Sequence, residues 1–411
     1  MVSVNEAPQF DVVVIGAGIH GAGVAQAAAA AGYSVLVVEQ YAAPAQGTSS
    51  RSSKLIHGGL RYLERGALGL VYECLRERRL LLRNAPTLVK AIPFYLPVYT
   101  HSTRPAWLLY IGLWIYRVLA GWSGIANFKR VPQHEWSQLD GLNTQNLRAV
   151  FQYYDAQTDD AALTAAVLAS AQRLGAVIKY STVCERLQLQ SAHVDVAIRN
   201  QAQALMVLIE AKVVVNAAGP WVNHVARKVQ PTVPVHDIEW VQGAHIVLPS
   251  FSGAAQQGIY YVEAPDGRPV FIMPWRGNIL VGTTETIFHG EPANVTATEV
   301  EIDYLLKIYN QYFGKTHLRQ HSDILETFAG LRVLPKDSIE VKTKSVAHNN
   351  LNARSRETLF VQAPVQQPRY FAIYGGKLTA YRATAEQILK QLRQTLPRKL
   401  AKANSRTLTL N

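Results

Sequence analysis

Cysteine is almost absent from the chain, which contains only Cys74 and Cys184 among its 411 residues. The two lie far apart in the sequence, and this spacing argues against both a disulfide framework and a cysteine-based metal site. Sparse, unpaired cysteine favours a reducing compartment, so we expect a cytoplasmic protein. We expect no bound metal.

Long hydrophobic runs are also missing. No stretch of about eighteen uncharged apolar residues is present, so the sequence predicts no membrane-spanning helix. Residues 1–10 lack a basic segment followed by an apolar one, and we expect no secretion signal there. The stretch 107–122 is aromatic and apolar, with Arg117 as its one charge. It is either a buried helix of a substrate domain or a helix that lies at a membrane surface.

Acidic residues are outnumbered, with 29 Asp and Glu against 41 Lys and Arg and a net charge of +12. Such a charge suits nucleic acid, an anionic membrane surface or an anionic substrate. Because no zinc-finger spacing and no block of basic and aromatic residues occurs, we expect no nucleic-acid partner. An apolar fraction of 48% over 411 residues indicates a large core and more than one domain.

The first forty residues have the pattern of a dinucleotide-binding unit. A β-branched strand, 11–15, leads into a glycine-rich turn. An alanine-rich helix, 22–31, and a second apolar strand, 34–38, follow in the order that the motif requires. The motif alone does not choose between NAD and FAD.

Each glycine of the motif has its own physical role. Gly16 allows a tight turn, Gly18 lets the backbone approach a pyrophosphate, and Gly21 lets the helix pack closely on the sheet. The amino end of the helix offers unpaired N–H groups to the phosphates. Glu39, 18 residues after Gly21, can accept hydrogen bonds from an adenosine ribose.

The next segment, 41–66, combines hydroxyl-bearing residues with a pair of glycines. Its small polar side chains suit a backbone that lies close to a ligand. The pair Gly58 and Gly59 indicates a close approach to a flat ring. A flexible surface linker is the alternative, although linkers seldom contain a run such as LIHGGLRYL.

The run SSKLIHGGLRYLE, from Ser52 to Glu64, resembles the FAD-dependent glycerol-3-phosphate dehydrogenases. These are respiratory flavoproteins of the glycine oxidase and D-amino-acid oxidase superfamily. The resemblance covers most of residues 10–390, through further matching segments at 104–107, 153–161, 215–221, 243–247, 274–275, 282–284, 329–332 and 375–382.

The resemblance implies an α/β fold (α+β overall) with two domains. A Rossmann-like FAD-binding domain with a parallel sheet is expected from residues 1–95, 151–230 and 325–411. A substrate-binding domain with an antiparallel sheet is expected from residues 96–150 and 231–324, where short alternating strands recur.

The resemblance and the glycine-rich segments together imply a set of FAD-binding residues. A closing strand, 370–374, is followed by a glycine pair and a helix, which is the same order of strand, glycine turn and helix as in the opening motif. The expected cofactor contacts are Gly16, Gly18, Gly21, Glu39, Thr48, Ser49, Ser53, Lys54, Leu55, His57, Gly58, Gly59, Val183, Ala218, Gly219, Gly375, Gly376, Lys377, Leu378 and Thr379.

Three cations are expected to hold the substrate. Arg61, Arg332 and Lys377 each follow a glycine-rich or family-matched turn, and a guanidinium suits a phosphate dianion. Tyr62 either hydrogen-bonds the substrate or serves only in packing. His245, on a predicted inner strand and of a type that titrates near neutrality, is the candidate base. The expected catalytic residues are therefore His245, Arg332 and Arg61.

By resemblance, the reaction is oxidation of sn-glycerol 3-phosphate to dihydroxyacetone phosphate, with hydride transfer to FAD and electron transfer to a quinone or similar acceptor. A peripheral position on the inner face of the cytoplasmic membrane goes with that acceptor. The alternatives are a flavin-dependent amine oxidase or 2-hydroxy-acid dehydrogenase of the same fold, and a flavin-binding protein without catalysis. The oligomeric state and the covalent or non-covalent attachment of flavin stay open.

The sequence departs from the family pattern at several points. His20 replaces a small polar residue, Glu285 replaces an aspartate, and Val333 after Arg332 suggests a re-aimed loop. Relatives continue into a helical carboxyl-terminal domain of roughly a hundred residues, which we expect this chain, ending at Asn411, to lack. That leaves dimer contacts and membrane docking open. The charged cluster 76–79, on a predicted amphipathic helix, is expected to be a solvated face.

Overall fold

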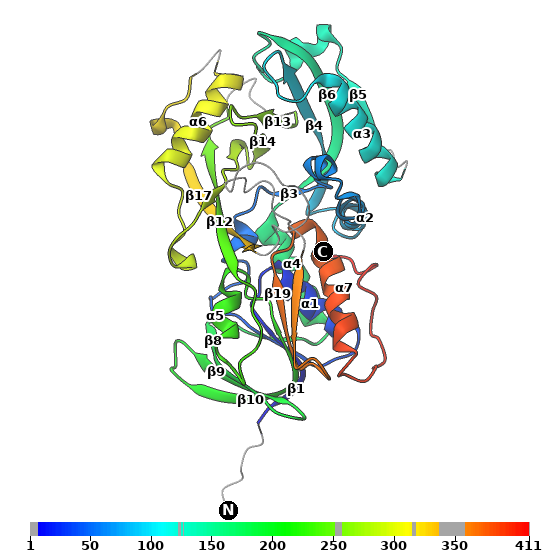
Figure 1. Ribbon diagram of the computed structural model, residues 1–411, viewed down its shortest axis with the longest axis vertical. Helices are drawn as coiled ribbons and strands as arrows, with labels where there is room; N and C mark the ends of the chain where they lie inside the picture. Colours follow the sequence, from blue (N-terminus) through cyan, green and yellow to red (C-terminus); the bar gives the residue numbers. More distant parts are fainter. Residues whose placement is uncertain are drawn as a thin grey trace, which may run out of the picture.

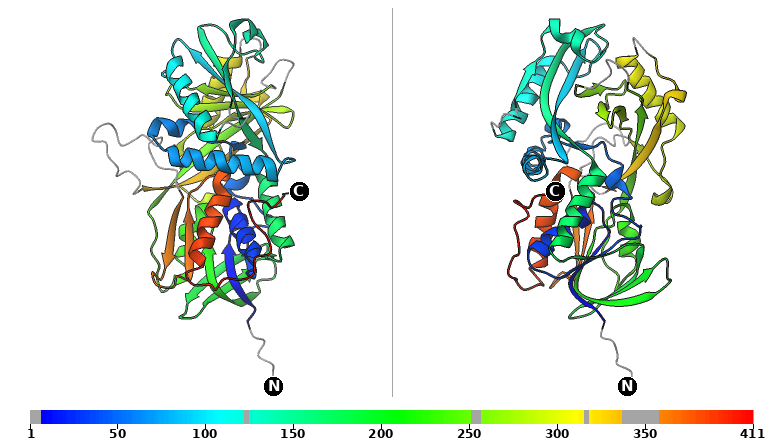
Figure 2. Two further views of the ribbon diagram at one scale, coloured as in Figure 1. Left: turned by 90° about the vertical axis from the view of Figure 1, so that its right-hand side faces the viewer. Right: turned by 180° about the vertical axis from the view of Figure 1, so that it is seen from behind.

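Two β-sheets organise the chain, and they occupy the lower and upper halves of Figure 1. The computed structural model describes residues 7–121, 125, 127–250, 257–314, 318–336 and 358–410. The helix α2 (Leu68–Asn84) runs across the molecule between the two halves (Figure 2).

The lower sheet contains the predicted dinucleotide-binding strands. Its strands run in the order β11-β8-β9-β10-β1-β2-β7, and β19 pairs with both β10 and β18. β1, β2, β10 and β19 are mutually parallel neighbours, so their carboxyl ends meet at one edge. The strands are β1 (Gln9–Ile15), β2 (Val35–Val38), β7 (Val177–Lys179), β8 (Thr182–Leu189), β9 (Val194–Asn200), β10 (Met206–Asn216), β11 (Val229–Gln230), β18 (Leu359–Ala363) and β19 (Tyr370–Tyr374).

Small residues allow the helices of the lower half to approach one another closely. The helix α1 (Ile19–Ala30) is buried along nearly its whole length beside α4 (Asp160–Arg173) and α7 (Tyr381–Leu392). A Cβ atom on Gly23 would lie 2.7 Å from the Tyr381 ring. The alanine-rich sequence therefore reflects close helix packing as well as helix propensity.

The upper sheet is largely antiparallel, as predicted. Its strands run in the order β16-β12-β15-β14-β13-β4-β6-β3, with β17 on β12 and β5 on β6. The strands are β3 (Leu55–Ile56), β4 (Val89–Tyr99), β5 (Phe128–Arg130), β6 (Leu147–Thr158), β12 (Ile238–Leu248), β13 (Ile259–Glu263), β14 (Pro269–Trp275), β15 (Asn278–Gly282), β16 (Thr286–Ile287) and β17 (Glu326–Pro335).

Helices cover the upper sheet and short helical turns connect the two halves. The helix α6 (Glu299–Phe313), which begins with a capping box at Thr298, packs on one apolar cluster, and α2 and α3 (Ala106–Ala120) pack on another. The remaining turns are α5 (Val222–Ala226), η1 (Thr48–Ser50), η2 (Leu60–Arg65), η4 (Gln133–Gln138), η5 (Gly219–Trp221), η6 (Pro292–Asn294), η7 (His321–Asp323) and η10 (Leu378–Ala380).

Four strands of the upper sheet depart from the domain limits expected from the sequence, and one of them, β3, lies within residues 1–95. β4 runs past residue 95, β6 begins before residue 151, and β17 lies in the upper sheet although residues from 325 onward were assigned to the FAD-binding domain. The reason for the last difference is pairing, because β17 is in register with β12 from Ile238 opposite Pro335 to Val247 opposite Glu326. The division into two domains itself stays a prediction.

The expectation of a solvated face for the charged cluster on α2 holds for Arg76 and Arg79, which are exposed, and was wrong for Glu77 and Arg78. Glu77 is buried and accepts two hydrogen bonds from the Arg382 guanidinium of α7, at 2.7 and 2.5 Å. Arg78 is buried as well and forms an ion pair with Asp155 of β6. A run of charges suggested exposure, but the partners lie on distant elements that the sequence pattern does not reveal.

Candidate active site

A cavity of about 590 Å³ lies between the two sheets and is lined by residues of both. Its lower wall is formed by the turns after β1, β2, β10 and β19, at the carboxyl edge of the parallel strands. Its upper wall is formed by β12, β14 and β17. The carboxyl edge is where open α/β sheets bind their ligands.

The opening glycine motif borders this cavity as the sequence predicts. Gly16 has φ +101°, and a Cβ atom there would lie 2.8 Å from the Ala217 carbonyl oxygen. Gly18 caps α1, and the Ile19 N–H donates to Ser49 Oγ at 2.9 Å. Gly21, expected among the cofactor contacts, does not line the cavity. A Cβ atom there would lie only 1.8 Å from the Gly16 carbonyl oxygen, so Gly21 serves the packing of helix on turn.

Glu39 is held at the end of β2 by backbone donors. Its carboxylate accepts hydrogen bonds from the Ala17 N–H at 2.6 Å and the Tyr41 N–H at 2.9 Å. Burial raises its pKa, and these backbone hydrogen bonds oppose the rise. A carboxylate has about four lone-pair positions. Glu39, which lines the cavity, therefore retains acceptor capacity for the hydroxyls of a ribose.

The second glycine turn lies opposite the first. Gly375 and Gly376 have φ values of +69° and +94°, and a Cβ atom on Gly376 would lie 2.4 Å from His20 Nε2. His20 is half-buried, and its desolvation lowers the pKa of the ring to about 4, so the ring is neutral at pH 7. Residues 377–379 also line the cavity, and the Thr379 hydroxyl accepts a hydrogen bond from the His57 N–H at 3.3 Å.

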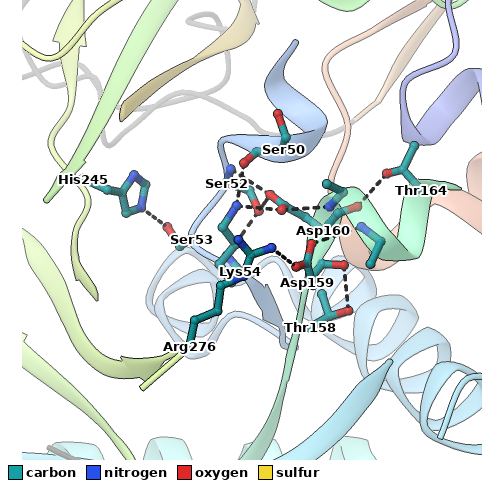
Figure 3. Close-up of polar contacts among 12 residues, drawn as sticks. Ser50, Ser52, Ser53, Lys54, Thr158, Asp159, Asp160, Thr164, His245 and Arg276 are labelled. Atoms are coloured by element: carbon teal, nitrogen blue, oxygen red, sulfur yellow. Dashed lines mark hydrogen bonds and ion pairs between the residues drawn. The ribbon is translucent and has the colours of Figure 1, made fainter. Parts of the chain in front are cut away.

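Lys54, expected to contact the cofactor, does not line the cavity. Its ammonium donates to Asp160 Oδ1 at 2.6 Å and to the Ser50 carbonyl at 2.5 Å (Figure 3). Asp160 also accepts hydrogen bonds from the N–H and the hydroxyl of Ser52. The correction has a simple cause, since a buried ammonium requires a buried carboxylate and Asp160 supplies it.

The residue before Lys54 points the other way. The Ser53 hydroxyl lies 2.9 Å from His245 Nε2, on the upper sheet (Figure 3). Asp159 is the N-cap of α4, and its carboxylate accepts a hydrogen bond from the Ala162 N–H at 3.0 Å. Asp160, in the first turn of α4, accepts a hydrogen bond from the Ala161 N–H at 2.9 Å, and its carboxylate also anchors the Ser52–Lys54 segment.

The two glycines after His57 have different roles: one lines the cavity and the other contacts α3. Gly59, with φ +80°, lines the cavity. Gly58, also expected to contact the cofactor, does not, because its N–H points away from the cavity and donates to the Tyr116 hydroxyl at 2.8 Å.

The other predicted cofactor residues all line the cavity, and their contacts with FAD stay a prediction. They are Thr48, Ser49, Ser53, Leu55, His57, Val183, Ala218, Gly219, Gly375, Gly376, Lys377, Leu378 and Thr379. The structure thus offers a long channel with glycine turns, hydroxyls and a helix amino terminus along one wall. Such a lining fits a dinucleotide that lies in extended form with a flat ring at one end.

Two of the three expected substrate cations meet at the far end of the cavity, beside Glu285. One guanidinium nitrogen of Arg61 and one of Arg332 each lie 3.7 Å from the same Glu285 oxygen. Lys377 Nζ lies 3.5 Å from the centre of the Tyr62 ring, so Tyr62 packs against a predicted substrate cation. All five side chains line the cavity.

Arg332 is held by a strand and not by a re-aimed loop, which corrects the expectation from Val333. It lies in β17 opposite Val241 of β12, and its guanidinium donates to the Thr283 hydroxyl at 3.2 Å. The strand therefore sets the direction of this side chain more tightly than a loop would.

His245 lies beside the cations and is almost fully buried. Its ring stacks on Phe328 with centroids 4.9 Å apart, and a Cβ atom on Gly282 would lie 2.1 Å from the imidazole. Burial holds its pKa well below the ordinary value, and the charges of Arg332 and Lys54 act in the same direction. The expectation that His245 titrates near neutrality is therefore corrected, because the ring is neutral throughout that range.

Sequence reasoning did not name two residues at this end of the cavity. Arg268 donates to the Glu285 carbonyl at 3.0 Å, and Tyr261 lies opposite Phe271 in the β13–β14 pair. The alternation along β13 and β14 could have indicated the inward-facing Tyr261. Arg268 precedes β14 without a motif around it, so its position depends on the fold.

Comparison with known proteins agrees with this architecture. Residues 11–397 match the family described as FAD dependent oxidoreductase. A D-erythritol 1-phosphate dehydrogenase of Brucella abortus is 36% identical over 388 residues, which cover 94% of this chain and 74% of that protein. A glycerol-3-phosphate dehydrogenase of Pseudomonas aeruginosa is 36% identical over 391 residues, which cover 93% and 71%.

A solved structure supports the same family relationship. The glycerol-3-phosphate dehydrogenase from Bacillus halodurans, complexed with FAD, superposes with a TM-score of 0.73 at 27% identity and covers 96% of this chain and 67% of that one. The resemblance seen in the sequence, its α/β fold class and its FAD cofactor are thereby confirmed. The chain belongs to the family of FAD-dependent oxidoreductases, among the relatives of the glycerol-3-phosphate dehydrogenases.

Proposed function

We propose that the chain oxidises sn-glycerol 3-phosphate to dihydroxyacetone phosphate. The observation that carries the proposal is the meeting of Arg61 and Arg332 beside His245, at the end of a cavity whose other wall suits FAD. FAD, when bound, supplies the hydride acceptor. The residues of the chain hold the phosphate, orient the secondary carbon and receive the hydroxyl proton.

The charge at this end favours a phosphate over a carboxylate. Arg61, Arg332 and Arg268 lie around Glu285 at this end, and Lys377 lines the cavity beside Tyr62, so cations outnumber the Glu285 carboxylate here. A guanidinium binds two phosphate oxygens at once, and a dianion gains more than a monoanion from several cations. An amino acid or 2-hydroxy acid needs one such cation for its carboxylate.

His245 is the proposed proton acceptor for the secondary hydroxyl. Because its ring is neutral, one of its nitrogens has a free lone pair at physiological pH. When Nε2 is that nitrogen, the Ser53 hydroxyl donates to it, and the substrate hydroxyl can take the same position. The neighbouring Arg332 disfavours a lasting imidazolium, which helps the proton to leave after turnover.

Anaerobic mixing of the flavin-loaded protein with glycerol 3-phosphate tests the proposal. We expect the flavin absorbance to bleach, and a protein that stays yellow would refute it. Glycerol tests the need for phosphate, and glycine, D-amino acids and 2-hydroxyglutarate test the other chemistries of this fold. D-erythritol 1-phosphate must also be tested as a substrate, because one relative is named as a dehydrogenase of this compound.

For the electron acceptor we propose a quinone, reached at a membrane surface. The helix α3 supports this, since one of its faces is exposed and apolar and lies at the outer edge of the upper half (Figure 1). The exposed side chains are Trp107, Leu108, Ile111, Trp114, Ile115 and Val118. Among the described residues no helix is both long and apolar enough to cross a bilayer.

Basic residues flank this apolar face. β5 lies beside α3, through the Phe128 ring next to Tyr110 and Trp114, and continues into exposed Lys129 and Arg130. An apolar helix face with neighbouring cations suits an anionic lipid surface. Co-sedimentation with anionic and neutral vesicles tests this, with Trp107→Ser on α3 and Val300→Ser on α6 as its exposed apolar control. Equal sedimentation of Trp107→Ser and wild type would refute the role of α3.

A further inference from the structure

A buried polar network lies behind the cavity wall, outside the cavity itself. Arg78 of α2 forms an ion pair with Asp155 of β6, and the Tyr116 hydroxyl of α3 donates to the other Asp155 oxygen at 2.6 Å. All three side chains are buried, and none of them lines the cavity. Three elements distant in the sequence thus meet at one carboxylate.

The network ends at the glycine pair that borders the cavity. The Gly58 N–H donates to the Tyr116 hydroxyl at 2.8 Å, so this oxygen both accepts and donates. A Cβ atom on Gly58 would lie 2.6 Å from the same hydroxyl and 2.8 Å from Leu75. Gly58 is therefore held between α3 and α2 and has no room to shift toward either.

The residues on both sides of Gly58 face the cavity. His57 and Gly59 line it, and η2, which starts directly after Gly59, presents Arg61 and Tyr62 to it. A displacement of Gly58 would move the flavin-facing turn and the first turn of η2 together. The hydrogen bond from Gly58 to Tyr116 therefore influences the position of two features: the turn that faces the cofactor, and Arg61, a proposed phosphate-binding residue.

Burying a charge pair is costly unless every group in it is satisfied. Burial raises the pKa of Asp155, although Arg78 and the Tyr116 hydroxyl oppose the rise. The same volume filled with apolar side chains would be at least as stable. The network therefore calls for a role besides stability, and its hydrogen bond to Gly58 connects it to the turn that borders the cavity.

We propose that Tyr116 is a positioning residue: its hydroxyl, oriented by Asp155 and Arg78, sets the Gly58–Gly59 turn and with it His57 at the cofactor and Arg61 at the substrate. The part that concerns Arg61 rests on the proposed function, and the part that concerns the flavin does not.

The test compares Tyr116→Phe with Tyr260→Phe in the flavin-loaded protein. Tyr260 is a matched control, because its buried hydroxyl donates to Asp140 at 3.0 Å in the same half and it does not line the cavity. The readouts are the absorbance maxima and reduction potential of the bound flavin, and the affinity for inorganic phosphate as an anion probe.

We expect Tyr116→Phe to shift the flavin spectrum and potential and to weaken phosphate binding by about twofold to tenfold, the worth of one hydrogen bond. Tyr260→Phe should lower the melting temperature and leave all three readouts as in wild type. Wild-type values in Tyr116→Phe, or equal changes in both variants, would overturn the proposal.

Asp155→Asn decides the matter if Tyr116→Phe does not retain flavin. It keeps the shape of the side chain and removes the charge that orients the hydroxyl, so it should shift the same readouts in the same direction. An unshifted spectrum and potential would overturn the proposal. Because no readout uses glycerol 3-phosphate, a wild-type protein that this substrate fails to bleach refutes the proposed function and leaves this test intact.

Discussion

His245 and Ser53 lie 192 residues apart in the sequence, yet His245 Nε2 is 2.9 Å from Ser53 Oγ. This contact joins β12 of the upper sheet to the loop that follows η1 in the lower half. The proposed base is thereby placed at the boundary between the cofactor wall and the substrate cations. The proposed chemistry requires this position, because the base must reach a substrate that lies between the cofactor and the cations.

Replacement of His245 tests its role as proton acceptor. We expect His245→Gln to lower the rate of flavin reduction by glycerol 3-phosphate by about 10²–10⁴-fold, the usual contribution of a general base. Bound flavin should remain. Stopped-flow absorbance measures the rate, and His134→Gln, at an exposed site, serves as the control. A rate within a factor of two of wild type would remove His245 from catalysis.

The pH dependence of the same rate follows from the lowered pKa of His245. The ring is neutral at pH 7 and stays neutral as the pH falls through about 6.5, the ordinary imidazole pKa. At saturating substrate we therefore expect a constant rate from pH 8 to 6.5 and a loss only at lower pH. A half-maximal rate near pH 6.5 would contradict the burial argument.

Arg332 should affect substrate affinity more than turnover. Arg332→Ala removes a charge-assisted contact worth about 1.5–3 kcal/mol, so the KM for glycerol 3-phosphate should rise about 10- to 150-fold. Steady-state kinetics with an artificial acceptor measure the change. Arg276→Ala is the control, since that guanidinium is 70% exposed and paired with Asp159. An unchanged KM in Arg332→Ala would exclude a phosphate contact.

The pair of Lys54 and Asp160 should be essential for stability. Lys54→Met leaves a buried carboxylate without its cation, which typically costs about 3–5 kcal/mol. Lys336→Met breaks an exposed pair with Asp237 and should cost no more than about 1 kcal/mol. Urea unfolding at one fixed FAD concentration compares them. Similar losses in both variants would contradict the structural role of Lys54.

His20 should make the protein sensitive to acid. Its pKa is lowered to about 4, so between pH 6.5 and 4 the unfolded chain binds a proton that the folded chain does not. The free energy of unfolding therefore falls as the pH falls through this range. His20→Asn should lose less stability between pH 7 and 5 than wild type in urea titrations at saturating FAD. Parallel curves would show that His20 titrates normally.

Local patterns predicted the elements well where one short segment contains its own signal. The strand 370–374 matches β19 residue for residue, because its apolar run and the glycine pair that ends it lie within one short stretch. Arg78 and Lys54 were placed wrongly for the opposite reason. Their burial depends on Asp155 and Asp160, which only folding brings near them.

The sequence by itself determined the dinucleotide motif, the family and the residue types of the site, because turn geometry and helix termini depend on neighbours in the chain. Only the tertiary structure decided what those residues face. It turned Ser53 toward His245 and Lys54 away, brought Arg61 and Arg332 to one Glu285, and connected Tyr116 to Gly58. The physical reason is that charge pairing, burial and pKa depend on distances in space, which strand register and helix packing set together.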